Sequence, residues 1–132
     1  KLIYTYYGSL KRAGAQVTFV TEYQPLDPEQ FPFLVVPAYQ MVSPALAKKW
    51  DDYVRKGGHL VLTSRTGAKA PNGHLWEGPL QQPIVSLIGA KVAYFDHLPA
   101  QYPGTVKVGD QSHKWHIWGD VLEPLPGTEV LG

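Results

Sequence analysis

Ser64 is the first residue in the sequence with a type and position suited to chemistry. It follows the apolar run Leu60–Leu62, and a hydrolase nucleophile often stands directly after a buried strand. The glycines of a Gly-x-Ser-x-Gly turn are missing around it. His59 precedes the same run, so about 16 Å of extended chain would separate it from the serine. A small serine hydrolase that uses Ser64 is therefore an alternative without an identified base.

The other chemical side chains form no recognisable catalytic or metal-binding pattern. His113 and His116 are three residues apart, but the extended pattern around them directs them to opposite faces. Asp51 and Asp52 are adjacent on a predicted helix and diverge in direction. The chain contains no cysteine and no glycine-rich phosphate-binding motif. The sequence therefore predicts no catalytic residue, no metal site and no cofactor.

The composition describes one packed domain, which we assign to residues 1–132. With 132 residues the chain is too short for two independent cores, and 44% of its residues are hydrophobic. It has no apolar run of the roughly 20 residues that a membrane span needs. The formal net charge is +1, which provides no strong field for phosphate backbones. Nucleic-acid and membrane partners are therefore not expected.

Aromatic residues are more numerous than a core of this size requires. The sequence contains four tryptophans and eight tyrosines. Exposed aromatic rings mark either a protein contact or a platform for a sugar ring. Trp50 is expected in the core, whereas Trp76 and Trp118 are expected at the surface. A carbohydrate-binding module is therefore a second alternative.

The middle of the chain alternates apolar strands with an amphipathic helix. Phe33–Val36 is a continuous apolar run, which is typical of a strand buried on both faces. Ser43-Pro44 predicts a helix start, because the serine can accept hydrogen bonds from free backbone N–H groups. Gly57-Gly58 ends that helix before the strand Leu60–Leu62. This order predicts an α/β layer structure with a parallel sheet.

The remaining elements are predicted from the same periodicities. We expect helices at about residues 3–13 and 83–88, and strands at Val17–Val20, Lys91–Phe95, His113–Val121 and Glu129–Leu131. A long connection, Ser64–Gly78, leaves the carboxyl end of a strand, where open α/β sheets bind ligands and partners. Arg65, Lys69 and Trp76 lie in this connection.

Several runs, taken in order, carry a resemblance to a known family. They are Tyr7–Ala15, Leu34–Ala38, Val42-Ser43, the helix end Trp50–Gly58, Leu60–Lys69, Pro79-Leu80, Leu87–Gly89 and Phe95-Asp96. Together they resemble the middle domain of glycoside hydrolase family 42 β-galactosidases, over most of residues 5–99.

This resemblance implies a flavodoxin-like fold similar to class I glutamine amidotransferases, a three-layer α/β sandwich with a mostly parallel sheet. In the family this domain serves for trimerisation, and the two catalytic glutamates belong to a (β/α)₈ barrel that has no counterpart in this chain. The amidotransferase cysteine is absent too. The resemblance thus implies a non-catalytic piece of a longer, bacterial, cytoplasmic β-galactosidase, in which the first strand of the domain fold is missing.

The implied partners are further copies of the chain, in a homotrimer, and the catalytic barrel of the same polypeptide. Galactosides would be bound only through the parent enzyme. The segment Arg65–Lys69 matches the family pattern Arg-Ser/Thr-Gly-x-Lys, although Ala70-Pro71 replaces the acidic residue that often follows it. Because aromatic and arginine side chains dominate interface energetics, we predict five interface residues. They are Tyr39, Arg65, Lys69, Trp76 and Trp118.

Overall fold

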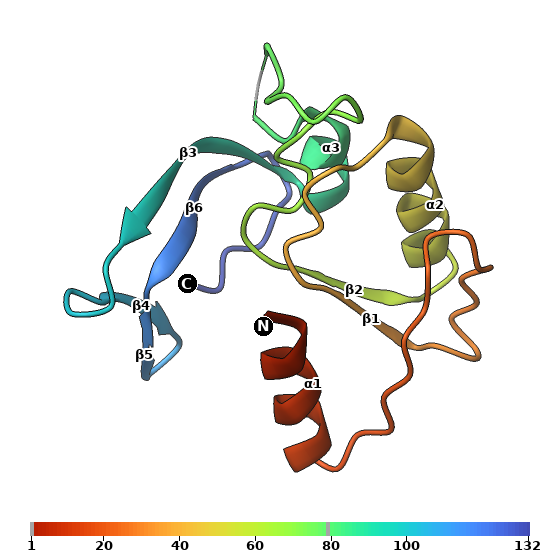
Figure 1. Ribbon diagram of the computed structural model, residues 1–132, viewed down its shortest axis with the longest axis horizontal. Coiled ribbons are helices and arrows are strands. Elements are labelled where there is room, and N and C mark those ends of the chain that lie inside the picture. Colours follow the sequence, from red (N-terminus) through yellow and green to blue (C-terminus); the bar gives the residue numbers. More distant parts are fainter. Residues whose placement is uncertain (1, 79) are drawn as a thin grey trace.

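The computed structural model describes residues 2–78 and 80–132. Lys1 and Pro79, the latter cited above for the family resemblance, lie outside the described residues. The elements are α1 (Leu2–Arg12), β1 (Phe33–Val36), α2 (Pro44–Arg55), β2 (His59–Leu62), a 3₁₀ turn η1 (Gln82–Ile84), α3 (Val85–Ile88), β3 (Ala90–Leu98), β4 (Gly104–Val108), β5 (Gln111–Trp115) and β6 (Ile117–Pro124) (Figure 1).

Helix α2 is fixed at both ends by local sequence. The Ser43 hydroxyl accepts a hydrogen bond from the Leu46 N–H at 3.1 Å, and proline occupies the first helical position, where no N–H is needed. Beyond the helix, Gly57 adopts a φ of 96°, which disfavours other residues. The turn leads directly into β2, which pairs in parallel with β1.

The hydrophobic core lies between this parallel pair and the helices α2 and α3. Its buried members are Val36, Val42, Leu46, Ala47, Trp50 and Ile84, with Leu26, Leu34, Leu60, Leu62, Leu87 and Ile88 packed against them. In the register of the pair, Leu34 lies opposite Leu60 and Val36 opposite Leu62. The side chains of these alternate residues therefore share one face of the sheet and point toward α2.

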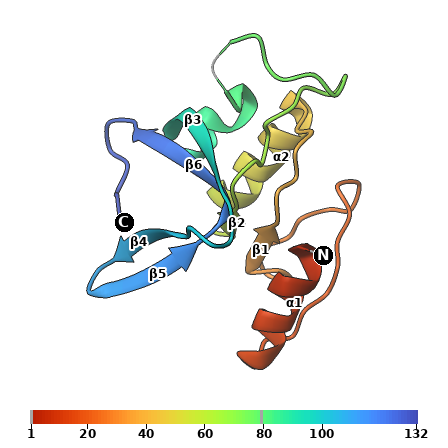
Figure 2. The same ribbon diagram turned by 60° about the vertical axis from the view of Figure 1, so that its left-hand side comes forward.

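The second half of the chain is an antiparallel ribbon that carries a protruding hairpin. Strand β3 pairs with β6, and β4 pairs with β5 (Figure 2). Between β5 and β6, Ile117 has a φ of 76°, and the Trp118 N–H donates to the His116 carbonyl at 3.1 Å. This three-residue turn is strained for a β-branched side chain. The turn directs the β4–β5 hairpin away from the β3–β6 ribbon.

Most of the predicted elements are confirmed. The structure contains α1, with Gly14 at a φ of 83° after it, and both strands of the parallel pair. It also contains α2, the helical segment of η1 and α3, and the predicted strand within β3. Trp50 is in the core.

Three strand predictions are wrong. Val17–Val20 and Glu129–Leu131 form no strand, since neither finds an edge to pair with among the described residues. His113–Val121 is divided into β5 and β6 by the turn at Ile117. Strand β4, which is not among the predicted strands, pairs with β5.

The sheet arrangement confirms the α/β class and only part of the predicted architecture. The strands of the described residues form three two-stranded sheets, of which one is parallel and two are antiparallel. A mostly parallel sheet in a three-layer, flavodoxin-like sandwich is not seen within residues 2–78 and 80–132. Helix α1 has no buried residue, so it covers no sheet.

Tyr53→Phe should lower the free energy of unfolding by about 1–2 kcal/mol, because it leaves a buried carbonyl without its donor. The Tyr53 hydroxyl donates to the Phe31 carbonyl at 2.7 Å, and the residue is 1% exposed. Urea unfolding followed by circular dichroism measures the change. Tyr102→Phe, at a position 72% exposed, is the matched control and should change nothing. Equal stabilities of the two variants would contradict the assignment.

Candidate functional site

The five predicted interface residues lie around one end of the parallel strand pair. Tyr39 follows β1, whereas Arg65, Lys69 and Trp76 follow β2. Trp118 lies near the start of β6, and its ring contacts the guanidinium of Arg65 in the same region. Because both parallel strands end at this edge, the structure brings together residues that are far apart in sequence.

The backbone of Gly67 is held by two of the predicted residues. Its N–H donates to the Tyr39 carbonyl, and its carbonyl accepts from Nε1 of Trp76, each at 2.9 Å. The Lys69 N–H donates to the Gln40 carbonyl at 2.9 Å. Gly67 has a φ of 72°, which favours glycine at this position. The connection after β2 is therefore firmly attached to the segment after β1.

Arg65 lies between two aromatic rings. Its guanidinium carbon is 4.3 Å from the ring centroid of Trp118 and 4.6 Å from that of Phe95. These distances are typical of cation–π contacts. The His97 ring packs edge-on against the Trp118 ring, with ring centroids 4.8 Å apart. We call the group Arg65, Phe95, His97 and Trp118 the aromatic plate.

Asp120 holds the aromatic plate against the parallel strands. Its Oδ2 atom accepts from the backbone N–H of Arg65 at 2.9 Å and from Nε2 of Gln81 at 2.8 Å. Gln81 is buried. Both residues that donate to Asp120 have positive φ angles, 69° for Arg65 and 56° for Gln81. Non-glycine residues adopt such angles rarely, so tertiary contacts must maintain them.

Sequence reasoning missed four residues of this site, namely Phe95, His97, Gln81 and Asp120. For Asp120 one signal is present in the sequence. Residues two apart in a strand share a face, so Trp118 and Asp120 belong together once β6 is recognised. Nothing local in the sequence connects Gln81 with Asp120, which lies 39 residues away.

Tyr39 makes a second set of contacts at the edge of the site. Its hydroxyl donates to Oε2 of Glu22 at 2.5 Å. This hydrogen bond, together with desolvation and the glutamate charge, raises the pKa of Tyr39 to about 12. The same bond is the main cause that lowers the pKa of Glu22. The phenol ring packs edge-on against Trp50, with centroids 6.2 Å apart.

Ser64 forms no hydrogen bond to a histidine or carboxylate among the described residues, and the Asp120 carboxylate near it is bound by Arg65 and Gln81. His59 lies at the opposite end of β2 and stacks on Phe33, with ring centroids 4.7 Å apart. No group of three or more histidines or carboxylates close enough to bind a metal occurs in the described part of the chain. No described helix has the length and apolar character of a membrane span.

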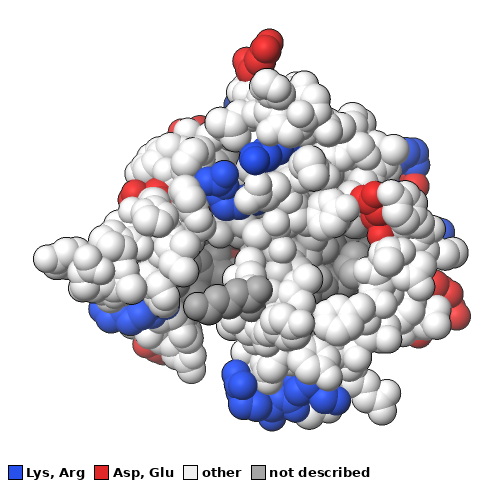
Figure 3. Space-filling view, viewed as in Figure 1, with Lys and Arg blue, Asp and Glu red and all other residues white. Residues whose placement is uncertain are grey.

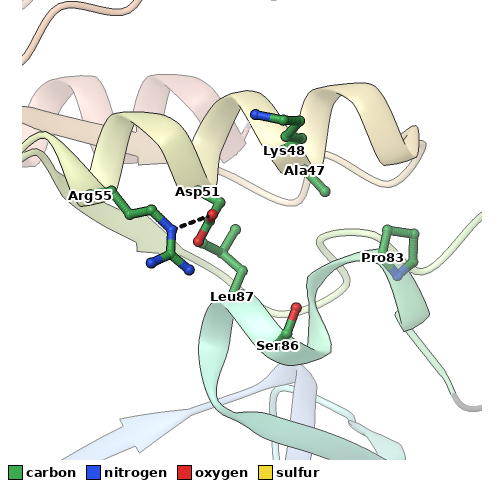
Figure 4. A pocket seen from close by; sticks show the side chains of 7 residues that line it. All are labelled: Ala47, Lys48, Asp51, Arg55, Pro83, Ser86 and Leu87. Atoms are coloured by element: carbon green, nitrogen blue, oxygen red, sulfur yellow. Dashed lines mark hydrogen bonds and ion pairs between the residues drawn. The ribbon is translucent and has the colours of Figure 1, made fainter.

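A hollow between α2 and α3 is equally unsuited to catalysis (Figure 4). Asp51 lines it but forms an ion pair with Arg55 at 2.6 Å. The neighbouring Asp52 pairs with Lys48 at 2.6 Å, which is the main cause of its lowered pKa. Both carboxylates are therefore occupied by cations on their own helix.

Charged side chains are distributed in small groups on the face shown in Figure 3. Lysine and arginine atoms gather at the bottom of the view, and acidic atoms appear in separate patches at the top and right. No broad surface of one sign is visible on this face. This pattern agrees with the near-neutral net charge of +1.

The comparison with protein families decides the identity of the domain. The family described as "Beta-galactosidase trimerisation domain", of glycoside hydrolase family 42, matches residues 1–132. The chain belongs to this family. The resemblance stated from the sequence runs is thereby confirmed.

Curated relatives of this trimerisation domain are β-galactosidases. The chain is 32% identical over 124 residues to β-galactosidase BgaH of Haloferax lucentense, covering 94% of this chain and 18% of that protein. It is 31% identical over 111 residues to BglY of Alicyclobacillus acidocaldarius, covering 82% and 15%. The chain thus spans less than a fifth of the length of these relatives, and the (β/α)₈ barrel is absent from it.

Solved β-galactosidase structures contain the same fold. The enzyme of the psychrophilic Marinomonas ef1 matches with a TM-score of 0.82 at 26% identity, covering 92% of this chain and 18% of that one. The enzyme of the Antarctic haloarchaeon Halorubrum lacusprofundi matches with a TM-score of 0.81 at 29% identity, covering 89% and 17%.

Asp120→Ala should lower the free energy of unfolding by about 1–3 kcal/mol, because Gln81 and the Arg65 N–H would lose their acceptor. Asp120→Asn keeps an acceptor oxygen and should cost less. Asp110→Ala, at the exposed turn of the hairpin, is the control. Urea unfolding measures all three. An Asp120→Ala variant as stable as the Asp110→Ala control would show that the carboxylate does not hold the site.

Tyr39 should titrate at about pH 12, and Glu22→Gln should move its pKa back toward the ordinary value of about 10. Since folding raises this pKa, the hydrogen bond stabilises the fold below about pH 10. That contribution is lost as the pH rises through about 12. Ultraviolet absorbance of the phenolate, with Tyr39→Phe as the reference, assigns the titration. A Tyr39 pKa near 10 in the unaltered chain would refute the bond.

Proposed function

We propose that this chain is the assembly domain of a longer β-galactosidase, in which it holds three subunits together while another part of the polypeptide hydrolyses galactosides. The observation that carries the proposal is the match of the trimerisation-domain family to residues 1–132, in a chain equal to 18% of a β-galactosidase's length. The absence of a hydrogen bond from Ser64 to a histidine or carboxylate in the described residues supports a non-catalytic role.

We propose the aromatic plate as the centre of the contact between subunits. Phe95 and Trp118 are each 38% exposed although their rings are fixed around Arg65. Rigid aromatic and arginine groups at the surface are typical binding hot spots, because they lose little conformational freedom on binding. In this proposal the rim of the subunit contact consists of Lys69, Tyr39 and Trp76. Lys69 and Trp76 lie in the connection after β2, and the Tyr39 carbonyl is hydrogen-bonded to that connection.

We further propose that the complete domain is a flavodoxin-like, class I glutamine amidotransferase-like sandwich. Its missing strand would precede α1 and pair with the edge of β1 that faces away from β2. Three observations support this placement. Helix α1 has no buried residue, Val17–Val20 forms no regular element, and Phe33 is 67% exposed on β1. A strand beside β1 would give all three a contact.

In this proposal the catalytic barrel is a partner within the same polypeptide, and galactosides bind only there. We place the parent enzyme in the cytoplasm, on the family resemblance alone. Neither a sugar-binding module nor a serine hydrolase is favoured by an observation at this site. The Trp118 face is occupied by Arg65, and Ser64 has no histidine beside it among the described residues.

The parent polypeptide should sediment as a trimer, and residues 1–132 alone should show no turnover of a chromogenic galactoside. Analytical ultracentrifugation over a wide concentration range and an activity assay give the two readouts. A monomeric parent would overturn the assembly function. Turnover by residues 1–132 that disappears in Ser64→Ala would establish the hydrolase alternative instead.

Trp118→Ala should weaken trimer association of the parent by about 10- to 100-fold, the range expected for an interface hot spot. Trp118→Phe should restore part of the affinity, because it retains a ring for Arg65. Tyr102→Ala, which removes an exposed ring outside the plate, is the control. Thermal unfolding separates a lost contact from a lost fold. Equal dissociation constants for the Trp118→Ala and control variants would exclude the plate from the interface.

A further inference from the structure

A groove of about 720 Å³ runs along one side of β2. Its lining includes the segment His59–Ser64, the apolar side chains of Ile84, Leu87 and Ile88, and Asp120 and Leu122 of β6, together with Phe33, Val54, Gly58 and Gln81. Its walls are therefore mostly apolar, and its polar end lies at Ser64 and Asp120. The aromatic plate borders this end through Arg65, which donates to Asp120.

The groove separates two unpaired strand edges. Within the described residues β2 pairs only with β1, and β6 pairs only with β3. In Figure 1 the ribbon of β3 and β6 lies to the left of the pair of β2 and β1, and β6 is nearer to β2 than β3 is. The free edge of β6 and the free edge of β2 thus lie on either side of the groove that both strands line.

The backbone of β2 directs hydrogen-bonding groups into the groove. The His59 N–H donates to the Pro32 carbonyl at 2.8 Å, on the β1 side. Because successive residues of a strand point their backbone groups to opposite edges, Val61 also faces β1. Leu60 and Leu62 then present their N–H and carbonyl groups to the groove. An edge of this kind is a template for another strand.

We propose that the groove receives one extended strand, which joins both pairs into a single five-stranded sheet in the order β1, β2, inserted strand, β6, β3. The size of the groove supports one strand. Strand spacing, sheet thickness and the rise of four residues enclose about 600 Å³. The cavity of about 720 Å³ is close to this volume.

Two buried polar atoms lie behind the polar end of the groove. Oδ1 of Asp120 is buried and accepts no hydrogen bond among the described residues, although Oδ2 of the same carboxylate accepts two. Nε of Arg65 is likewise buried without an acceptor. Buried polar atoms are rarely left in this state. The inserted strand brings apolar side chains to Leu87 and Leu122, which line the groove.

The occupant is the stretch of the parent polypeptide that follows Gly132. This identification rests on the proposed function, which makes the chain one domain of a protein about five times as long. Figure 2 shows the C-terminus on the β6 side of the molecule, whereas the N-terminus lies by α1 on the β1 side. Gly132 lies beside Lys107 of β4. The residues after Gly132 thus begin on the β6 side of the groove.

Amide hydrogen exchange tests this proposal with a control inside the same strand. In residues 1–132 alone, the Leu60 and Leu62 amides should exchange at least 100-fold faster than those of His59 and Val61. In the parent polypeptide all four should be protected alike. Fast exchange at Leu60 and Leu62 in the parent would overturn the proposal. So would protection of both in residues 1–132 alone, since the groove would then be closed without a further strand.

Single cysteines provide a second readout, because residues 1–132 contain none. Leu122→Cys lies in the groove and Leu75→Cys outside it, at positions 51% and 50% exposed. Thiol labelling, located by peptide mass spectrometry, should be similar for both in residues 1–132. In the parent, Leu122→Cys should react at least 100-fold more slowly than Leu75→Cys. Equal rates there would contradict an inserted strand.

Dilution of the parent separates this inference from the assembly function. Protection that persists when ultracentrifugation shows a monomer places the strand in the same polypeptide, as proposed. Protection that disappears with the trimer would assign the groove to a neighbouring subunit and overturn our choice of occupant. A parent that is monomeric at every concentration, yet protected at Leu60 and Leu62, would refute the assembly function and leave the inserted strand supported.

Discussion

One carboxylate oxygen joins the two halves of this domain through hydrogen bonds. Oδ2 of Asp120 belongs to the antiparallel ribbon, yet it binds the Arg65 N–H after β2 and the Gln81 side chain before α3. These donors are 55 and 39 residues away in sequence. Both belong to residues with positive φ angles, so their backbone conformations depend on the same acceptor. The stacking of Arg65 on Trp118 depends in turn on this placement.

The site is rigid although it is exposed, which is unusual for a loop at the end of a strand. Hydrogen bonds from Gly67 and Trp76 fix the connection after β2, and the Thr66 hydroxyl donates to the Thr63 carbonyl at 2.8 Å. A surface organised in this way loses little entropy when a partner binds. The geometry is therefore suited to recognition of a partner.

Elements with complete local signals could be predicted from the sequence, and elements that depend on distant partners could not. Ser43-Pro44 and the glycines after α2 specify that helix by themselves, and the run Phe33–Val36 is apolar enough to be recognised alone. Val17–Val20 has the same kind of composition but forms no strand, because a strand exists only with an edge to bind. The hairpin was missed for the opposite reason, since its two polar strands pair with each other without a buried face.

The candidate site shows the same division. Arg65 and Trp118 could each be chosen by residue type and position, because arginine and tryptophan are frequent in interfaces. Their contact could not be predicted, since it requires the turn at Ile117 and the pairing of β3 with β6. Gln81 carries no signal of its own in the sequence. It became part of the site only when the fold placed its amide beside Asp120.

The turn at Ile117 makes the hairpin an independent appendage of the domain. Its direction is set by backbone angles at its base and by the Trp115 ring, which lies against Gly104 and Gly119 with no room for a Cβ at either. No buried side chain of the core belongs to its strands. Extra residues at its tip, next to Gly109, would therefore extend outward without reaching the core.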